Sequence, residues 1–301
     1  MRTKTYLFAL MAMALTLGSC SDNENGIGGE TSKYITVSTS IGNMTRVATD
    51  EKGGQTFEEG DEISVYAWTG APTVAPETSE RVVNNAINKL TNGSWVATPQ
   101  MLWKNNRDKH YFIGVYPVSA ISDLSAGEYT FDETKQVESD LLVAVNKDGL
   151  SYNADEQQTV PLTFTHVMAK LVVNLTYKNQ WGTEGPTVEK VVVGNAVKKA
   201  TINYLTKVVT PSTTAKEDFS LPEITENTKY VSVIIPQEDV KQLTIVIGGK
   251  NFVYDNGTPF KLESGKITTV NLEVGRDEIK LGDVKITDWE NGSTFSGEAL
   301  N

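Results

Sequence analysis

Residues 170–177 are Lys-Leu-Val-Val-Asn-Leu-Thr-Tyr, a run in which apolar side chains recur at every second position. Leu171, Val173 and Leu175 fall on one face of an extended strand, while Asn174 falls on the other. A period of two is typical of a strand in an antiparallel sheet that buries one face and exposes the other. We therefore expect Leu171, Val173 and Leu175 to point into a hydrophobic core.

The same alternation recurs from Lys33 onward through most of the 301 residues. Pairs of turn-forming residues separate the alternating runs, as they do in β-hairpins. The clearest runs begin at Ile35, Ile63, Val231, Leu243 and Val270, and the turn pairs are Asn92-Gly93, Gly248-Gly249, Asn256-Gly257, Ser264-Gly265 and Asn291-Gly292. The sequence therefore predicts an all-β protein built from β-sandwich domains, mainly antiparallel.

One segment, Glu80 to Leu90, carries its apolar residues at helical spacing instead. Asparagines at positions 84, 85 and 88 lie within it. The spacing favours a helix, whereas asparagine disfavours one.

The polar stretch Ser151 to Thr159 precedes a strong strand that begins near Val160. A polar stretch of this kind is typical of a boundary between domains. We therefore expect an N-terminal sandwich over residues 34–157 and a C-terminal sandwich over residues 158–301, each of an ordinary domain size.

The first 20 residues have the features of a bacterial lipoprotein signal peptide. Arg2 and Lys4 precede an apolar run, Tyr6 to Leu17, which is too short to span a bilayer as a helix. Leu17-Gly18-Ser19-Cys20 resembles a lipobox, in which Cys20 receives a diacyl chain and becomes the new N-terminus. Cys20 is the single cysteine, so it has no disulfide partner within the chain. The alternative is an ordinary signal peptide with a free thiol near its end.

Residues 21–33 follow as a polar segment that begins Ser21-Asp22-Asn23-Glu24-Asn25. It has too few apolar residues to fold, so we expect a flexible tether. Its acidic start resembles the tether that carries lipoproteins to the outer face of the outer membrane in the Bacteroides group. The alternative is a plain linker with no role in export.

Charge and composition argue against several classes of function. The chain has 27 basic and 38 acidic residues, a net charge of −11 and no basic run, so its surface repels nucleic acid. Two histidines and one cysteine are too few for a zinc site of the His-rich or His–Cys kind. No serine lies in a nucleophile-elbow pattern. We therefore expect a protein that is not an enzyme, with no cofactor, no metal and no nucleic-acid partner.

The histidines and tryptophans leave two alternatives open. His166 lies within an apolar string and is expected to be a hydrogen-bonded core residue at the domain junction. A hydrolase that uses His110 or His166 is the less favoured alternative. The five tryptophans suggest glycan binding, because aromatic rings stack on sugar faces, although tryptophan more often supplies core or interface area.

Several local patterns, in their order along the chain, resemble the fimbrillin family of the Bacteroidales, the pilins and pilus-associated lipoproteins of type V pili. The most distinctive is the string Leu162-Thr163-Phe164-Thr165-His166-Val167-Met168-Ala169-Lys170-Leu171. The others are Thr45-Arg46, Phe57 to Tyr66, Asn92 to Trp95, Leu102-Trp103, Val115-Tyr116-Pro117, Asp140 to Ala144, Ile235-Pro236-Gln237 and Ile286 to Trp289. The resemblance covers nearly the whole chain and implies two tandem transthyretin-like β-sandwiches.

The resemblance also implies a processing site and a mode of assembly. Pilins of this family are cut after an arginine in the position of Arg46, so the new N-terminus here is expected at Val47. The cut removes the strand Ile35 to Ile41 and opens a groove, which a terminal segment of another subunit fills by strand addition. Val284 to Leu300 is a candidate donor segment. The alternative is that Arg46 is an ordinary surface residue and that Ile35 to Ile41 stays paired.

We therefore expect a surface-exposed lipoprotein of the cell outer membrane that is a structural subunit of a type V-like fimbria and supports adhesion. Its partners are expected to be other fimbrial subunits, by donor-strand exchange, and the membrane, through lipid on Cys20. The second hypothesis is a glycan-binding or adhesin lipoprotein on the same scaffold, with a host protein or a glycan as its receptor.

Overall fold

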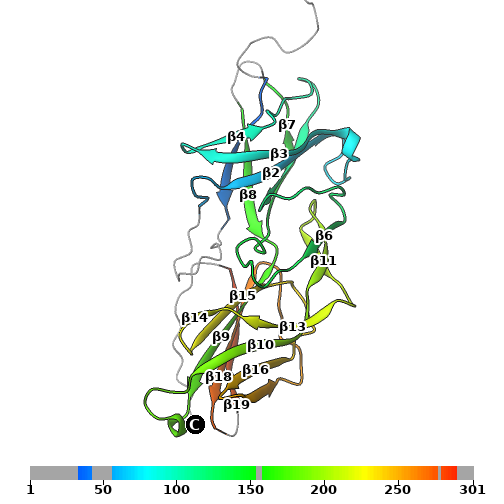
Figure 1. Cartoon of the computed structure of the whole chain (residues 1–301). Coiled ribbons are helices and arrows are strands. Elements are labelled where there is room, and N and C mark those ends of the chain that lie inside the picture. The colour runs from blue at the N-terminus through cyan, green and yellow to red at the C-terminus, as the bar shows by residue number, and fades with distance from the viewer. Residues whose placement is uncertain (1–32, 43–55, 154–157, 277–278, 290–301) are drawn as a thin grey trace, which may run out of the picture.

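The computed structural model describes residues 33–42, 56–153, 158–276 and 279–289 (Figure 1). Strands make up 57% of it and helix 3%, so the predicted all-β fold is confirmed. The described helices are two single 3-10 turns, Thr78–Glu80 and Asn179–Trp181. The strands form an N-terminal sheet and a C-terminal pair of sheets, which lie one after the other along the molecule (Figure 1).

The N-terminal part is one seven-stranded sheet. Its order is β1 (Thr36–Ile41), β8 (Thr159–His166), β7 (Leu142–Leu150), β5 (His110–Tyr116), β2 (Glu62–Thr69), β3 (Arg81–Thr91) and β4 (Ser94–Thr98). β1 pairs with β8 in parallel, and the other pairs are antiparallel. The end strands β1 and β4 lie close together, so the sheet curls around a core of its own.

The C-terminal part is a sandwich of two sheets. One has the order β14 (Glu223–Thr225), β15 (Lys229–Ile234), β9 (Ala169–Tyr177), β18 (Lys266–Val274) and β19 (Ile279–Asp288). The other has the order β13 (Lys216–Leu221), β10 (Val188–Val197), β16 (Gln242–Ile247) and β17 (Lys250–Asp255). The side chains of Leu171, Val173 and Leu175 on β9 are 0%, 0% and 3% exposed, which confirms their predicted direction. β9 and β18 form the second parallel pair.

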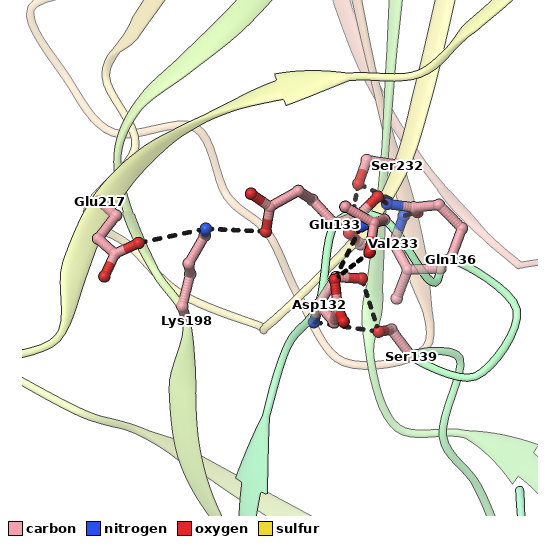
Figure 2. A network of polar contacts seen from close by, with 9 residues as sticks. Asp132, Glu133, Gln136, Ser139, Lys198, Glu217, Ser232 and Val233 are labelled. Carbon is pink, nitrogen blue, oxygen red and sulfur yellow. Dashed lines mark hydrogen bonds and ion pairs between the residues drawn. The ribbon is translucent and has the colours of Figure 1, made fainter.

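A fourth, three-stranded sheet joins the two parts. β6 (Gly127–Thr130), which precedes β7 in the chain, pairs with β11 (Lys199–Asn203), and β11 pairs with β12 (Val208–Pro211). Polar contacts also connect the two parts (Figure 2). Lys198 lies 2.8 Å from Glu133 and 3.2 Å from Glu217, and the backbone N of Val233 donates to Gln136 at 2.8 Å. One apolar cluster runs from the N-terminal sheet into the C-terminal sandwich, so the two parts share a core at their junction.

The helix considered for Glu80 to Leu90 is wrong, because Arg81–Thr91 forms strand β3. Asn85 has a positive φ of 58°, and the pairing of β2 with β3 shifts register between Val65 and Ala67. A β-bulge of this kind adds one residue to a strand. The buried side chains Val83 and Ala86 therefore lie three positions apart instead of two, which imitates helical spacing.

The two-residue turns fit the predicted hairpins. Asn92 and Gly93, between β3 and β4, have φ of 52° and 74°, and Gly248 and Gly249, between β16 and β17, have 57° and 70°. Two successive positive φ angles are typical of the type I′ turn, whose twist matches that of the flanking strands.

β8 begins just after the boundary expected at residues 157/158, yet it pairs with β1 and β7. Leu162 and Phe164 on β8 belong to the N-terminal core. This pairing favours a boundary at the connection between β8 and β9, which is formed by Val167 and Met168.

Candidate functional site

β1 occupies one end of the N-terminal sheet and pairs with β8 on one side. Ile35, just before it, is 1% exposed and Val37 is 6% exposed, so this edge strand fills part of the core. Ahead of β1, the backbone N of Ile35 donates to Met101 at 2.9 Å. From Thr36 to Ile41 the other side of β1 pairs with no strand of the described chain, which leaves a backbone edge facing β4.

A groove of about 640 Å³ lies between β1 and β4. Every residue of β1 lines it, together with residues of the β3–β4 hairpin and Phe57. None of the lining residues is charged, and most of them carry hydroxyl or apolar side chains. Trp95 Nε1 donates to Thr39 Oγ1 at 3.0 Å, so one side chain connects the two banks of the groove.

Aromatic rings pack beside this groove. The ring of Phe57 meets those of Trp95, Tyr116 and Phe164 edge-on, with centroid distances of 5.3, 5.5 and 5.1 Å. Each such pair contributes about 0.5–1.5 kcal/mol beyond the area that it buries. The wall next to β1 is therefore firm and apolar, which is what an accepted strand needs for its inward side chains.

The site residues predicted from the sequence, Cys20, Arg46 and Val47, lie outside the described residues. The strand expected before Arg46 is present as β1, which ends at Ile41. The structure therefore shows the strand that processing is expected to remove, and it leaves the processing itself as a prediction.

Both histidines are buried and hydrogen-bonded. His110 Nε2 accepts from the backbone N of Lys104 at 3.1 Å, and its Nδ1 donates to the carbonyl of Asp108 at 3.1 Å. Burial lowers the pKa of His110 below its ordinary value. His166 Nδ1 lies 2.6 Å from Asp140 Oδ1, which confirms the expected core histidine at the junction. The described residues contain no group of three or more His, Cys, Asp or Glu side chains placed to bind a metal.

The tryptophans are mostly inside. Trp68, Trp103 and Trp289 are buried, and Trp95 and Trp181 are half-buried. The indole N–H of Trp181 donates to the carbonyl of Val274 at 3.0 Å, as a packed residue does. The five rings therefore give weak support to a row of sugar-stacking platforms. No helix of the described part is long and apolar enough to cross a membrane.

The comparisons with known proteins agree with this architecture. A family model described as fimbrillin-like matches residues 45–289. The chain belongs to the fimbrillin-like family. No curated protein matches the chain significantly.

Solved structures with the same fold include proteins from several Bacteroides species. A candidate cell adhesion protein from Bacteroides uniformis has a TM-score of 0.65 at 18% identity, covering 87% of this chain and 100% of that one. A second, from Bacteroides ovatus, has a TM-score of 0.65 at 17% identity, covering 86% and 99%. A fimbrial protein from Bacteroides vulgatus has a TM-score of 0.50 at 12% identity, covering 75% and 92%. At these identities the likeness concerns the fold, and the fimbrillin-like family supports a fimbrial role at the cell surface.

Sequence reasoning missed the contacts that hold the junction. Asp140 and Trp289 both stood in patterns that pointed to the fimbrillin-like family, but nothing in the sequence indicated that each of them contacts His166. The loop of Figure 2 that carries Glu133 and Gln136 was missed as well, because its polar composition resembles that of any surface loop.

Proposed function

We propose that this chain is a structural subunit of a cell-surface fimbria whose N-terminal sheet accepts a strand from another subunit in place of β1. The observation that carries the proposal is the position of β1 at the end of the sheet, with Ile35 and Val37 in the core. Such a strand is attached to the domain by one ladder, a few apolar side chains and the covalent chain that follows it. Its partners are protein subunits, and no catalytic step is part of the role.

A cut between Arg46 and Val47 would break the covalent link that holds β1 to the rest of the domain. β1 would then stay in place through its pairing with β8 and through the burial of Ile35 and Val37. Burial of these two side chains contributes about 3–6 kcal/mol to the attachment of β1. Loss of β1 leaves the β8 ladder unpaired and the core open to water. An incoming strand restores both the hydrogen bonds and the apolar contacts, which is the physical drive for assembly.

The identity of the donor needs a correction at the C-terminal end. The candidate Val284 to Leu300 begins inside β19, where Val284 pairs with Val270 and Ile286 with Thr268. These residues already complete the subunit's own sheet. A donor taken from this region therefore has to leave β19 or to begin beyond Trp289.

N-terminal sequencing of protein from native cell surfaces tests the proposal. A start at Val47 in high-molecular-weight polymer is expected for a stalk subunit. Arg46→Gln should prevent the cut and leave monomer, whereas Arg46→Lys should still be cut by a trypsin-like protease and is the matched control. A start at Cys20 alone, always in monomer, would remove strand exchange at β1 and leave an anchor or a glycan-binding role.

The groove supports one alternative, a surface lipoprotein that binds a neutral glycan. Hydroxyls of Ser38, Thr39 and Ser40 line it beside the half-buried ring of Trp95, and no charged side chain lines it. Binding of neutral oligosaccharides that Trp95→Ala abolishes and Trp181→Ala preserves would favour this function over strand acceptance.

A further inference from the structure

The C-terminal strand β19 is poorly buried along its length and firmly buried at its end. Leu281, Val284 and Ile286 are 38%, 40% and 38% exposed, although their partners across the ladder on β18 lie in the core. Trp289, the residue after the strand, is 0% exposed. One side chain therefore holds the end of a strand that otherwise has little apolar attachment.

Trp289 packs against the other half of the molecule. Its ring stacks on the ring of His166 at a centroid distance of 4.0 Å and an interplanar angle of 9°. His166 is the last residue of β8, so this stack joins a strand of the C-terminal sandwich to a strand of the N-terminal sheet. Lys170 Nζ lies 5.5 Å from the Trp289 ring centroid, and the backbone N of Trp289 donates to Gly265 at 3.3 Å.

The same few residues hold the connection between β8 and β9. The backbone N of Val167 donates to Leu141 in the N-terminal part at 3.0 Å, and its carbonyl accepts from Ser264 Oγ in the C-terminal part at 2.8 Å. The backbone N of Gly265 donates to Met168 at 2.8 Å. The Trp289 stack therefore lies beside the two-residue connection between the two parts.

The closed stack leaves two polar atoms unpaired. His166 Nε2 and Trp289 Nε1 are buried, and neither has a hydrogen-bond partner in the described part of the chain. Lys170 is half-buried, and its desolvation lowers the pKa of its ammonium group while Asp140 raises it. Opening the stack would return these groups to water, and this gain offsets part of the lost apolar burial. The closed stack therefore carries a desolvation cost that an open arrangement would not.

Strand β8 connects the Trp289 stack to β1, because it contacts both. From Thr159 to Phe164 β8 pairs with β1, and from Phe164 to His166 it pairs with β7, so Phe164 alone belongs to both ladders. Loss of β1 therefore leaves β8 held in the sheet by its last three residues, and the last of these is the residue on which Trp289 stacks. Changes at the two places are linked through a single strand.

We propose that Trp289 is a latch that couples β1 to the C-terminal strand. While β1 is in place, Trp289 stays on His166 and β19 stays in its own sheet. Departure of β1 loosens the end of β8, opens the stack and frees the last residues of β19. The inference rests on the proposed function. In a subunit that loses β1 and so becomes an acceptor, the latch would also release the end of β19. By linkage, opening the latch loosens β1 in turn.

Amide hydrogen exchange on the mature full-length protein tests the latch without any polymer. Trp289→Ala is expected to speed exchange about tenfold or more in β19, in residues 166–168 and in β1, as local opening does. Trp181→Ala, which removes a half-buried tryptophan away from the junction, is the control and should leave residues 166–168 and β1 unchanged. Trp289→Phe keeps an aromatic ring on His166 and should give a smaller effect, so it serves if the alanine variant does not fold.

The outcomes separate the latch from the proposed function. Faster exchange confined to β19, with residues 166–168 and β1 unchanged, would overturn the coupling. Faster exchange in all three segments supports the latch, whether or not protein cut after Arg46 polymerises. Failure of the cut protein to polymerise would count against the proposed strand exchange and not against the latch. Polymer from cut wild-type protein together with unlinked exchange would retain the function and remove the latch.

Discussion

Leu171 has no exposed surface and lies between the two sheets of the C-terminal sandwich. Leu171→Asp places a carboxylate there with no cation built to meet it. We expect the free energy of unfolding to fall by roughly 3–5 kcal/mol, the cost of an uncompensated buried charge. Urea denaturation followed by circular dichroism measures it.

The control lies on the same strand. Thr176 is exposed and its Oγ1 donates to the carbonyl of Leu272 at 3.3 Å, a bond that serine keeps, so Thr176→Ser should change stability by less than about 0.5 kcal/mol. Asn174→Asp is a poorer control, because Asn174 donates to Asn271 at 2.8 Å and a carboxylate has no proton to give. Equal urea midpoints for Leu171→Asp and the wild type would contradict the assigned register.

His110 makes the folded state sensitive to mild acid. Burial lowers its pKa in the folded protein, while the unfolded chain keeps a pKa of about 6.5. As the pH falls through that value, the unfolded state binds the proton before the folded state does. Stability should therefore be constant at higher pH and should fall below about pH 6.5 until the lower folded pKa is reached. Unfolding free energies from about pH 8 to about pH 5 give the curve.

His110→Gln isolates this effect, since glutamine offers a donor and an acceptor but does not titrate. The variant and the wild type share every other side chain, so the difference between them reports on His110. We expect the wild type to lose its advantage over the variant as the pH falls. A difference that stays constant over the whole range would show that His110 keeps its ordinary pKa.

At the scale of the element, β1 is the strand whose attachment matters most. Val37 is 6% exposed in the N-terminal core, whereas the neighbouring Ser38 is exposed. Val37→Asp should destabilise the attachment of β1 by about 3 kcal/mol and Ser38→Asp by less than about 0.5 kcal/mol. Amide exchange in residues 159–163 should rise in the first variant and stay unchanged in the second, because those residues of β8 pair with β1. Protection that is unaltered in Val37→Asp would mean that β8 does not depend on β1.

β1 and β3 show where strand prediction works and where it stops. The alternation of Ile35, Val37 and Ile41 was sufficient to predict the strand, because one face is buried. Its parallel pairing with β8, more than a hundred residues later in the chain, has no local signal. In β3 the bulge at Asn85 broke the period, so periodicity favoured the wrong element. The local sequence pattern of a strand indicates which of its faces is buried. Which strand it pairs with depends on residues far away in the sequence.

At the scale of the whole molecule, the sequence predicted two β-rich parts but not the contacts that join them. The sheet at the junction pairs Gly127–Thr130 with Lys199–Asn203, and the Trp289–His166 stack joins positions that lie even farther apart in the sequence. Such contacts arise when separate sheets meet, so neither periodicity nor composition reveals them. The candidate site could be predicted only in part for the same reason. The sequence predicted strand β1, but the groove between β1 and β4 forms only because the sheet curls, and the curl has no local sequence signal.

Attachment of the whole molecule to a membrane should depend on Cys20. The chain has a net charge of −11 and no basic cluster, so it lacks the electrostatic second signal that holds weakly lipidated proteins on anionic membranes. Each buried methylene of an acyl chain contributes about 0.8 kcal/mol, so a diacyl group is a sufficient anchor by itself. Cys20→Ala should therefore abolish incorporation of labelled fatty acid and block signal cleavage at this site, without harming the two β-rich parts, whereas Ser21→Ala should change neither. Labelled fatty acid in Cys20→Ala would refute the lipobox, because no other cysteine is present in the chain to receive the diacyl group.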